Sequence, residues 1–79
     1  MNVEVLLPQW GMGMTEGIVV AWLKQVGDEV AADEPLVEIE AAKTTEILES
    51  PAAGRLVEIR VPEGETVEVR SVLAIIETA

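Results

Sequence analysis

This chain of 79 residues lacks both cysteine and histidine. The usual thiol nucleophile, imidazole proton shuttle and zinc ligands are therefore missing, and the composition argues against a stand-alone enzyme. No disulfide can staple the fold, and the absence of cysteine gives no hint of secretion. Carboxylates are plentiful, but their spacing matches no calcium-binding loop, so we expect neither catalytic residues nor a metal site.

Basic residues and long apolar runs are also scarce. Five basic residues face fifteen acidic ones, a net charge of −10, which disfavours nucleic acid and anionic membranes as partners. No apolar run approaches the ~20 residues of a membrane span, and the N-terminus lacks the basic region of a signal peptide. We expect a cytoplasmic protein. The acidic residues could dock on positively charged protein surfaces or simply keep the domain soluble, and both interpretations stay open.

What the chain does contain is an internal repeat within a single expected domain, residues 1–79. Shifting the sequence by 37 positions places Gly17 on Gly54 and Gly27 on Gly64, together with several apolar positions between them. The halves span about 3–41 and 45–78. Residues 45–48, which follow the first copy, correspond to 3–7 at the opposite end of the chain.

Each half reads as strands separated by turns. Apolar and polar residues alternate over 3–7, 37–41, 57–61 and 67–70, and the two repeat-related glycines at 27 and 64 suit tight turns. The uninterrupted apolar run 18–23 predicts a strand covered on both faces or at a barrel end. The chain is therefore expected to be all-β: a flattened β-barrel or barrel-sandwich hybrid of two small antiparallel sheets with a pseudo-two-fold repeat.

Residues 38–49 contain strong helix formers, but the alternation that ends at Ala41 and the repeat both favour a hairpin. We expect a strand to about Ala41, a turn at Ala42 and Lys43, and a strand from about Thr45. The repeat predicts both chain termini at the end of the molecule opposite Lys43.

With these residues in place, the sequence resembles the biotinyl/lipoyl carrier domains, and most closely the lipoyl domains of 2-oxo acid and acetoin dehydrogenase acyltransferase subunits. The resemblance covers nearly the whole chain. It rests on residues 7–17 (LPQWGMGMTEG), 22–30 (WLKQVGDEV) and 38–44 (EIEAAKT). Lipoyl domains usually carry a glycine sixteen residues before the modified lysine, a glutamate three before it and a glycine eleven after it; here these are Gly27, Glu40 and Gly54.

The resemblance implies that Lys43 carries lipoate in amide linkage. Glu40, Ala42 and Thr44 would then serve ligase recognition, while Gly27 and Gly54 would act through backbone shape. Biotin is the alternative cofactor, but biotin carriers usually flank the lysine with methionines, whereas Ala42 and Thr44 stand here. Ala42 also departs from the acidic residue that most lipoyl domains place there.

The long loop from Pro8 to Glu16 favours lipoate over biotin, because the second copy has no counterpart to about six of its residues. Its members beside the expected arm are Trp10, Gly11, Met12 and Met14. Trp10 and the two methionines could shield a dithiolane ring, although packing of the barrel end is the preferred interpretation. The glycine pattern of this loop does not have dinucleotide-binding spacing.

The implied function is that of a non-catalytic carrier, part of or partner to a dihydrolipoamide acyltransferase. Its partners would be a lipoyl ligase or octanoyl/lipoyl transferase, a thiamin-dependent decarboxylase, the acyltransferase core and dihydrolipoyl dehydrogenase. A biotinyl carrier domain of a carboxylase and an unmodified interaction domain of the same fold remain the alternatives.

Overall fold

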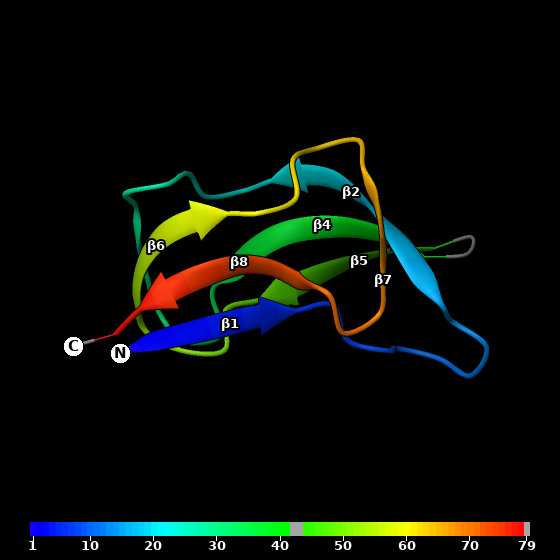
Figure 1. Ribbon diagram of the computed structural model, residues 1–79, viewed down its shortest axis with the longest axis horizontal. Coiled ribbons are helices and arrows are strands. Elements are labelled where there is room, and N and C mark those ends of the chain that lie inside the picture. Colours follow the sequence, from blue (N-terminus) through cyan, green and yellow to red (C-terminus); the bar gives the residue numbers. More distant parts are fainter. Residues whose placement is uncertain (42–43, 79) are drawn as a thin grey trace.

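The computed structural model describes residues 1–41 and 44–78, which form eight strands (Figure 1). The strands are β1 (Asn2–Leu6), β2 (Glu16–Trp22), β3 (Glu29–Val30), β4 (Pro35–Ala41), β5 (Thr44–Glu49), β6 (Gly54–Ile59), β7 (Thr66–Glu68) and β8 (Val72–Glu77). Within these residues, no helix is long and apolar enough to cross a membrane.

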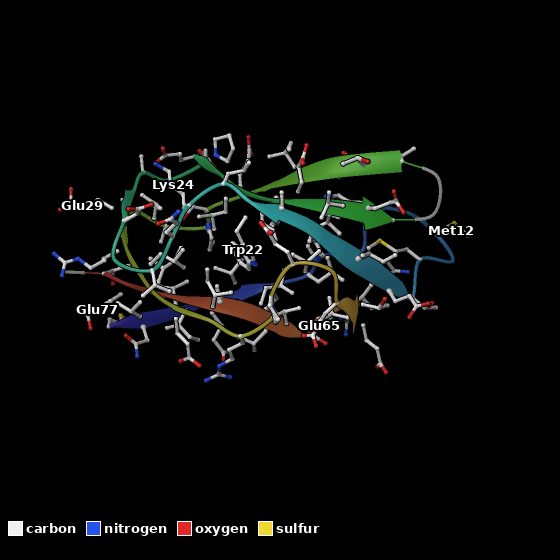
Figure 2. All side chains as sticks on the ribbon, turned by 90° about the horizontal axis from the view of Figure 1, so that it is seen from above. Met12, Trp22, Lys24, Glu29, Glu65 and Glu77 are labelled. Carbon is white, nitrogen blue, oxygen red and sulfur yellow. The ribbon has the colours of Figure 1, made fainter. Side chains whose placement is uncertain are left out.

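The strands form two separate antiparallel sheets, with orders β1-β8-β6-β3 and β5-β4-β2-β7. Seen from above, the sheets lie one over the other with side chains between them (Figure 2). The predicted all-β fold of two small facing sheets is confirmed. The described strands do not close into one continuous barrel.

The two sheets are related by the sequence repeat. The repeat maps β2, β3 and β4 onto β6, β7 and β8, and it maps β5 onto β1, so one strand order converts into the other without change. Even the irregularities match: a register shift between Val19 and Ala21 recurs between Leu56 and Glu58. The pseudo-two-fold symmetry therefore extends to individual β-bulges.

Each copy lends its short middle strand to the sheet of the other. The turn glycines, at φ of 100° (Gly27) and 92° (Gly64), lead into these exchanged strands. The N–H of Gly27 donates to the carbonyl of Leu56 at 2.7 Å, and the N–H of Gly64 donates to that of Val19 at 2.7 Å. Because the exchange is reciprocal, neither half can complete its sheet without the other.

The core lies between the sheets. Its fully buried large side chains are Val5, Leu7, Val19, Leu36, Val37, Ile39, Leu56, Leu73 and Ile76. Burial of one such side chain contributes about 1.5–3 kcal/mol, so a domain this small depends on nearly all of them.

Two expectations about buried faces are wrong. The run 18–23 is not covered on both faces, because Ile18 and Val20 are 38% and 44% exposed on the outer face of their sheet. In the first copy the apolar run hides an ordinary alternation, because Gly17 and Val19 are buried while Ile18 and Val20 face outward. In the second copy, Ile59 and Val61 pack in or against the core as expected, but beside the bulge Leu56 is buried and Val57 is only half-buried. There the alternation misplaces Val57 because a bulge changes which residues face inward.

The chain ends meet at one end of a molecule that measures 36 × 21 × 17 Å (Figure 1). The N–H of Thr78 donates to the carbonyl of Met1 at 2.8 Å, and the N-terminal amine donates to the carbonyl of Thr78 at 3.1 Å. The end of β4 and the start of β5 lie at the opposite end. The termini are therefore far from the connection between these two strands.

Candidate functional site

The β4–β5 hairpin forms the end of the molecule that is remote from the termini. Ala41 pairs with Thr44 across the two strands, and the Thr44 hydroxyl donates to the Ala41 carbonyl at 3.2 Å. This pairing leaves only residues 42 and 43 for the connection. The predicted hairpin is confirmed in its two strands, while Ala42 and Lys43 lie outside the described residues.

Helix propensity fails to decide residues 38–49 because strand pairing outweighs it. Val37, Ile39 and Ala41 are buried between the sheets, whereas Glu40 is exposed on the outer face. Glu40 faces Thr45 on one neighbouring strand and Ile18 on the other. Its carboxylate is thus open to a protein approaching this face beside the tip.

The loop after β1 lies beside the same tip and is held by its own hydrogen bonds. The N–H of Met14 donates to the Gly11 carbonyl at 3.2 Å, and the Gln9 amide donates to the Met14 carbonyl at 3.2 Å. The Trp10 N–H lies 3.4 Å from the Met14 sulfur, a weak acceptor. Gly13 has a φ of 84°, which a side chain would strain.

Between this loop and the hairpin lies a pocket of about 310 Å³. It is lined by Trp10, Gly11, Met12, Gly13 and Met14 from the loop, and by Ala41, Thr44 and Glu46 from the hairpin. The loop side is therefore aromatic, apolar and sulfur-rich. The hairpin side adds a hydroxyl and a carboxylate.

The three large loop side chains have different surroundings. Met14 packs against the core, in keeping with the packing interpretation. Met12 is fully exposed, at 103%, and lies at the tip end of the molecule in Figure 2, while Trp10 is 38% exposed. Core packing thus accounts for Met14 but not for Met12.

The two glycines of the resemblance lie elsewhere. Gly54 belongs to the strand pair β3–β6 and lies against the backbone of Glu77, at the terminal end of the molecule. The Gly27 turn docks on the same strand β6 through Leu56. The structure brings these glycines close to one another but not to the tip. Any effect on the site would act through the backbone.

Glu46 and Gly13 were missed in the sequence. Glu46 pairs with Ile39, whose side chain is buried, so the glutamate lies on the core side of an edge strand. Once a hairpin is centred on residues 42 and 43, this pairing follows by counting outwards from the turn. Gly13 stood in the glycine pattern of the loop, but its role in the bend is visible only in the structure, through its positive φ.

Lys24, the only other lysine, is engaged away from the tip (Figure 2). Its ammonium lies 2.7 Å from the Glu34 carboxylate. The hydrogen bond to Glu34 raises the pKa of Lys24, and the same bond lowers the pKa of Glu34. Lys24 thus serves as a matched comparison for any lysine chemistry at position 43.

Comparison with known proteins agrees with this geometry. The sequence profile of the family described as "Biotin-requiring enzyme" matches residues 3–76. The dihydrolipoyllysine-residue succinyltransferase component of the 2-oxoglutarate dehydrogenase complex from Bartonella vinsonii subsp. berkhoffii is 47% identical over 77 residues. That match covers 98% of this chain but only 19% of the relative.

Two solved structures share the fold. The lipoyl domain of the 2-oxoglutarate dehydrogenase complex from Azotobacter vinelandii superimposes with a TM-score of 0.79 and 29% identity, covering 96% of each chain. Kluyveromyces lactis urea carboxylase superimposes with a TM-score of 0.84 and covers 98% of this chain but 6% of the carboxylase. At 23% identity, the second likeness concerns the fold alone.

Proposed function

This chain belongs to the biotin/lipoyl attachment family, and on that premise we propose that it is a lipoyl carrier domain with Lys43 as its attachment site. The supporting observation is the hairpin: its paired ends leave Lys43 in a two-residue connection at the end remote from the termini. A lysine amine forms a stable amide with a carboxylic acid, and its four-carbon stem lengthens the arm. A tether at the termini would leave that tip free to enter other active sites.

The residues around the tip fit a covalently held apolar group. When attached, lipoate supplies the disulfide that accepts acyl groups and electrons, chemistry that a chain without cysteine cannot provide. The exposed carboxylate of Glu40 and the hydroxyl of Thr44 flank the connection and would mark it for a ligase or transferase, as would Ala42. Gly27 and Gly54 would contribute only through backbone shape, in the sheet that faces the sheet of the hairpin across the core.

The parent assembly is proposed by similarity. The succinyltransferase relative belongs to a 2-oxo acid dehydrogenase complex, and we infer the same class of complex for this chain, with acetoin cleavage as a variant. Its partners would be a thiamin-dependent decarboxylase, an acyltransferase core and dihydrolipoyl dehydrogenase. Tethering near these enzymes would raise the effective concentration of the arm to the millimolar range, about the value for short flexible linkers. A cytoplasmic location stays a prediction.

Biotin is the second candidate. The family description "Biotin-requiring enzyme" keeps it in view, but the match to a separate lipoyl domain covers almost all of both chains. The loop that lines the pocket is the insertion that favoured lipoate in the sequence.

Intact mass spectrometry after co-expression tests the proposal. With lipoyl ligase and lipoate, the wild type should gain one lipoyl group, and Lys43→Arg should gain none. Lys24→Arg is the matched control and should be modified like the wild type. With biotin ligase and biotin, no adduct should form. A biotin adduct, or modification of Lys43→Arg, would contradict the cofactor or the site, respectively.

A further inference from the structure

The pocket beside the hairpin has the size of a small-molecule site. An apolar cavity of roughly 150 Å³ can hold benzene, and the volume here is about 310 Å³. That is room for a five-membered ring together with part of an attached hydrocarbon chain. The pocket opens between two segments far apart in the sequence, the loop 10–14 and the strands on either side of residues 42 and 43.

The loop wall is already formed without a ligand. Backbone and side-chain hydrogen bonds tie Gln9, Gly11 and Met14 together, and the positive φ of Gly13 fixes the bend. Met14 is anchored on the core, which holds one side of the wall in place. Binding here would cost little loop ordering, and a low ordering cost lets even a small ligand gain from its contacts.

The wall composition selects the ligand. An aromatic ring and two thioethers are polarizable surfaces that favour apolar, sulfur-containing groups. Glu46 at the other wall disfavours phosphates and carboxylates. The fully exposed Met12 has no protein surface to cover in the described residues, so its side chain is available to close over a bound group.

We propose that this pocket is a resting site for the oxidised dithiolane ring of the lipoyl arm on Lys43 of the same chain. This rests on the proposed function. Residue 43 lies directly between positions 41 and 44 in sequence, and Ala41 and Thr44 both line the pocket, so an arm that folds back reaches it without a second molecule. Glu40, on the outer face of its strand, does not line it.

The arm then exchanges between a docked and an extended state. Only the extended state can enter another active site. The apparent reactivity of the ring is therefore its intrinsic reactivity multiplied by the fraction of molecules whose arm is extended. If the ring is docked nine-tenths of the time, its reaction with an external reagent slows about tenfold. An S-acylated open chain has lost the compact ring and would bind less well.

The chain carries its own spectroscopic reporters. Trp10, Met12 and Met14 line the pocket, whereas Trp22 and Met1 do not, so two indole N–H signals and three methionine methyl signals separate the two regions. The indole N–H of Trp22 donates to the Val61 carbonyl at 2.8 Å, and its signal serves as an internal control. In NMR spectra, the Trp10 and Met12 signals of the oxidised lipoylated protein should be shifted relative to those of the unmodified protein. Nuclear Overhauser contacts should join these two side chains to the dithiolane ring. Trp22 and Met1 should not move.

A chemical test uses the rate at which a water-soluble phosphine reduces the ring. Met12→Ala and Trp10→Ala should speed this reduction by about threefold to tenfold, because they shift the arm to the extended state. Val26→Ala, which truncates an apolar residue that is 57% exposed and outside the pocket, should leave the rate unchanged. Lipoylation of each variant is measured first by intact mass.

Equal reduction rates in all variants, with pocket signals unchanged by lipoylation, would overturn the resting site while leaving the carrier function intact. Absence of a lipoyl adduct on the wild type would instead overturn the carrier function itself. Folding of the variants is checked by the Trp22 signal, which should keep its wild-type position.

Discussion

Gly54 has no space for a side chain. A Cβ built on it would lie 2.2 Å from the carbonyl oxygen of Glu77, a backbone atom of the neighbouring strand that cannot rotate away. Its repeat partner Gly17 is also tight, with a built Cβ 2.8 Å from the Ile39 side chain. The sequence reveals this pair as glycines at matched positions, but the close approach itself depends on the packing of two strands.

Gly54→Ala should therefore lower the free energy of unfolding by about 3 kcal/mol, because the pair β6–β8 must separate to admit a methyl group. Gly11→Ala is the matched control. Nothing lies within 4 Å of its built Cβ, so the change should stay within about 0.5 kcal/mol. Urea unfolding followed by circular dichroism gives both values. Equal midpoints for the two variants would refute the steric argument.

The turn glycines were predictable, but two other turn residues were not. Asp33 and Arg70 stand 37 positions apart with φ of 66° and 71°, a conformation that costs a non-glycine residue about 1–2 kcal/mol. Nothing in the sequence marks Arg70, because arginine has no preference for a positive φ. The repeat alone, once one member is known, points to the other.

At the scale of elements, β5 is an edge strand with five of its six residues exposed. Edge strands expose unpaired backbone groups that can recruit another chain, and an inward-pointing charge is one defence. Glu46 provides it, because it pairs with the buried Ile39 on the core side of the sheet. On the matching edge strand β1, the equivalent position is Val3.

Removing that charge should promote edge-to-edge association. We expect Glu46→Val to form dimers or larger species as its concentration rises, with little loss of folding stability. Glu46→Lys keeps a charge at this position and should remain monomeric. Sedimentation velocity at several concentrations distinguishes them, and a monomeric valine variant would show that the edge is protected in another way.

The sequence predicts element types better than element faces. Alternation located β4, and the repeat decided the hairpin over a helix, since strand pairing is a property of two segments rather than one. The outer face of β2 was missed because its exposed positions 18 and 20 are apolar, and Val57 in β6 was misplaced because of the bulge after Leu56. The candidate site was predictable as far as its loop and hairpin, whereas the pocket between them depends on how the two pack together.

At the scale of the whole molecule, the net charge of −10 opposes compaction. Only two ion pairs, Lys24–Glu34 and Arg60–Glu58, occur within residues 1–41 and 44–78. Such exposed pairs contribute little. Because the pKa of Glu34 is lowered in the folded protein, its carboxylate stabilises the fold at pH values above the ordinary pKa of a glutamate. This stabilisation is lost as the pH falls through the pKa that Glu34 has in the folded state. Because the pKa of Lys24 is raised above its ordinary value of 10.5, its ammonium stabilises the fold at pH values below 10.5. This stabilisation is lost as the pH rises through the pKa that Lys24 has in the folded state.

At pH 7 Lys24 and Glu34 are both charged, and their attraction is small beside the mutual repulsion of the excess carboxylates. Added salt, which screens both, should therefore weaken the repulsion more than the attraction. Raising sodium chloride from about 0.02 M to about 0.5 M shortens the Debye length several-fold and should raise Tm by about 5 °C. Potassium chloride should act alike, since the effect depends on ionic strength. Calorimetry checks this, and a Tm that falls with salt would show that the ion pairs outweigh the repulsion.

The contact between Met1 and Thr78 occupies the position in one copy that the pair Ala41–Thr44 occupies in the other. Bridging the ends by a two-residue link like that between Ala41 and Thr44 would close the backbone into a ring with two hairpin tips, of which the Ala41–Thr44 tip alone lies beside the long loop. A lysine in the new link would add a second candidate attachment site. The closed ring would, however, have no free terminus through which it could be tethered to another domain. In such a ring the chain ends would no longer distinguish the two tips, and the long loop beside the Ala41–Thr44 tip would be the main difference between them.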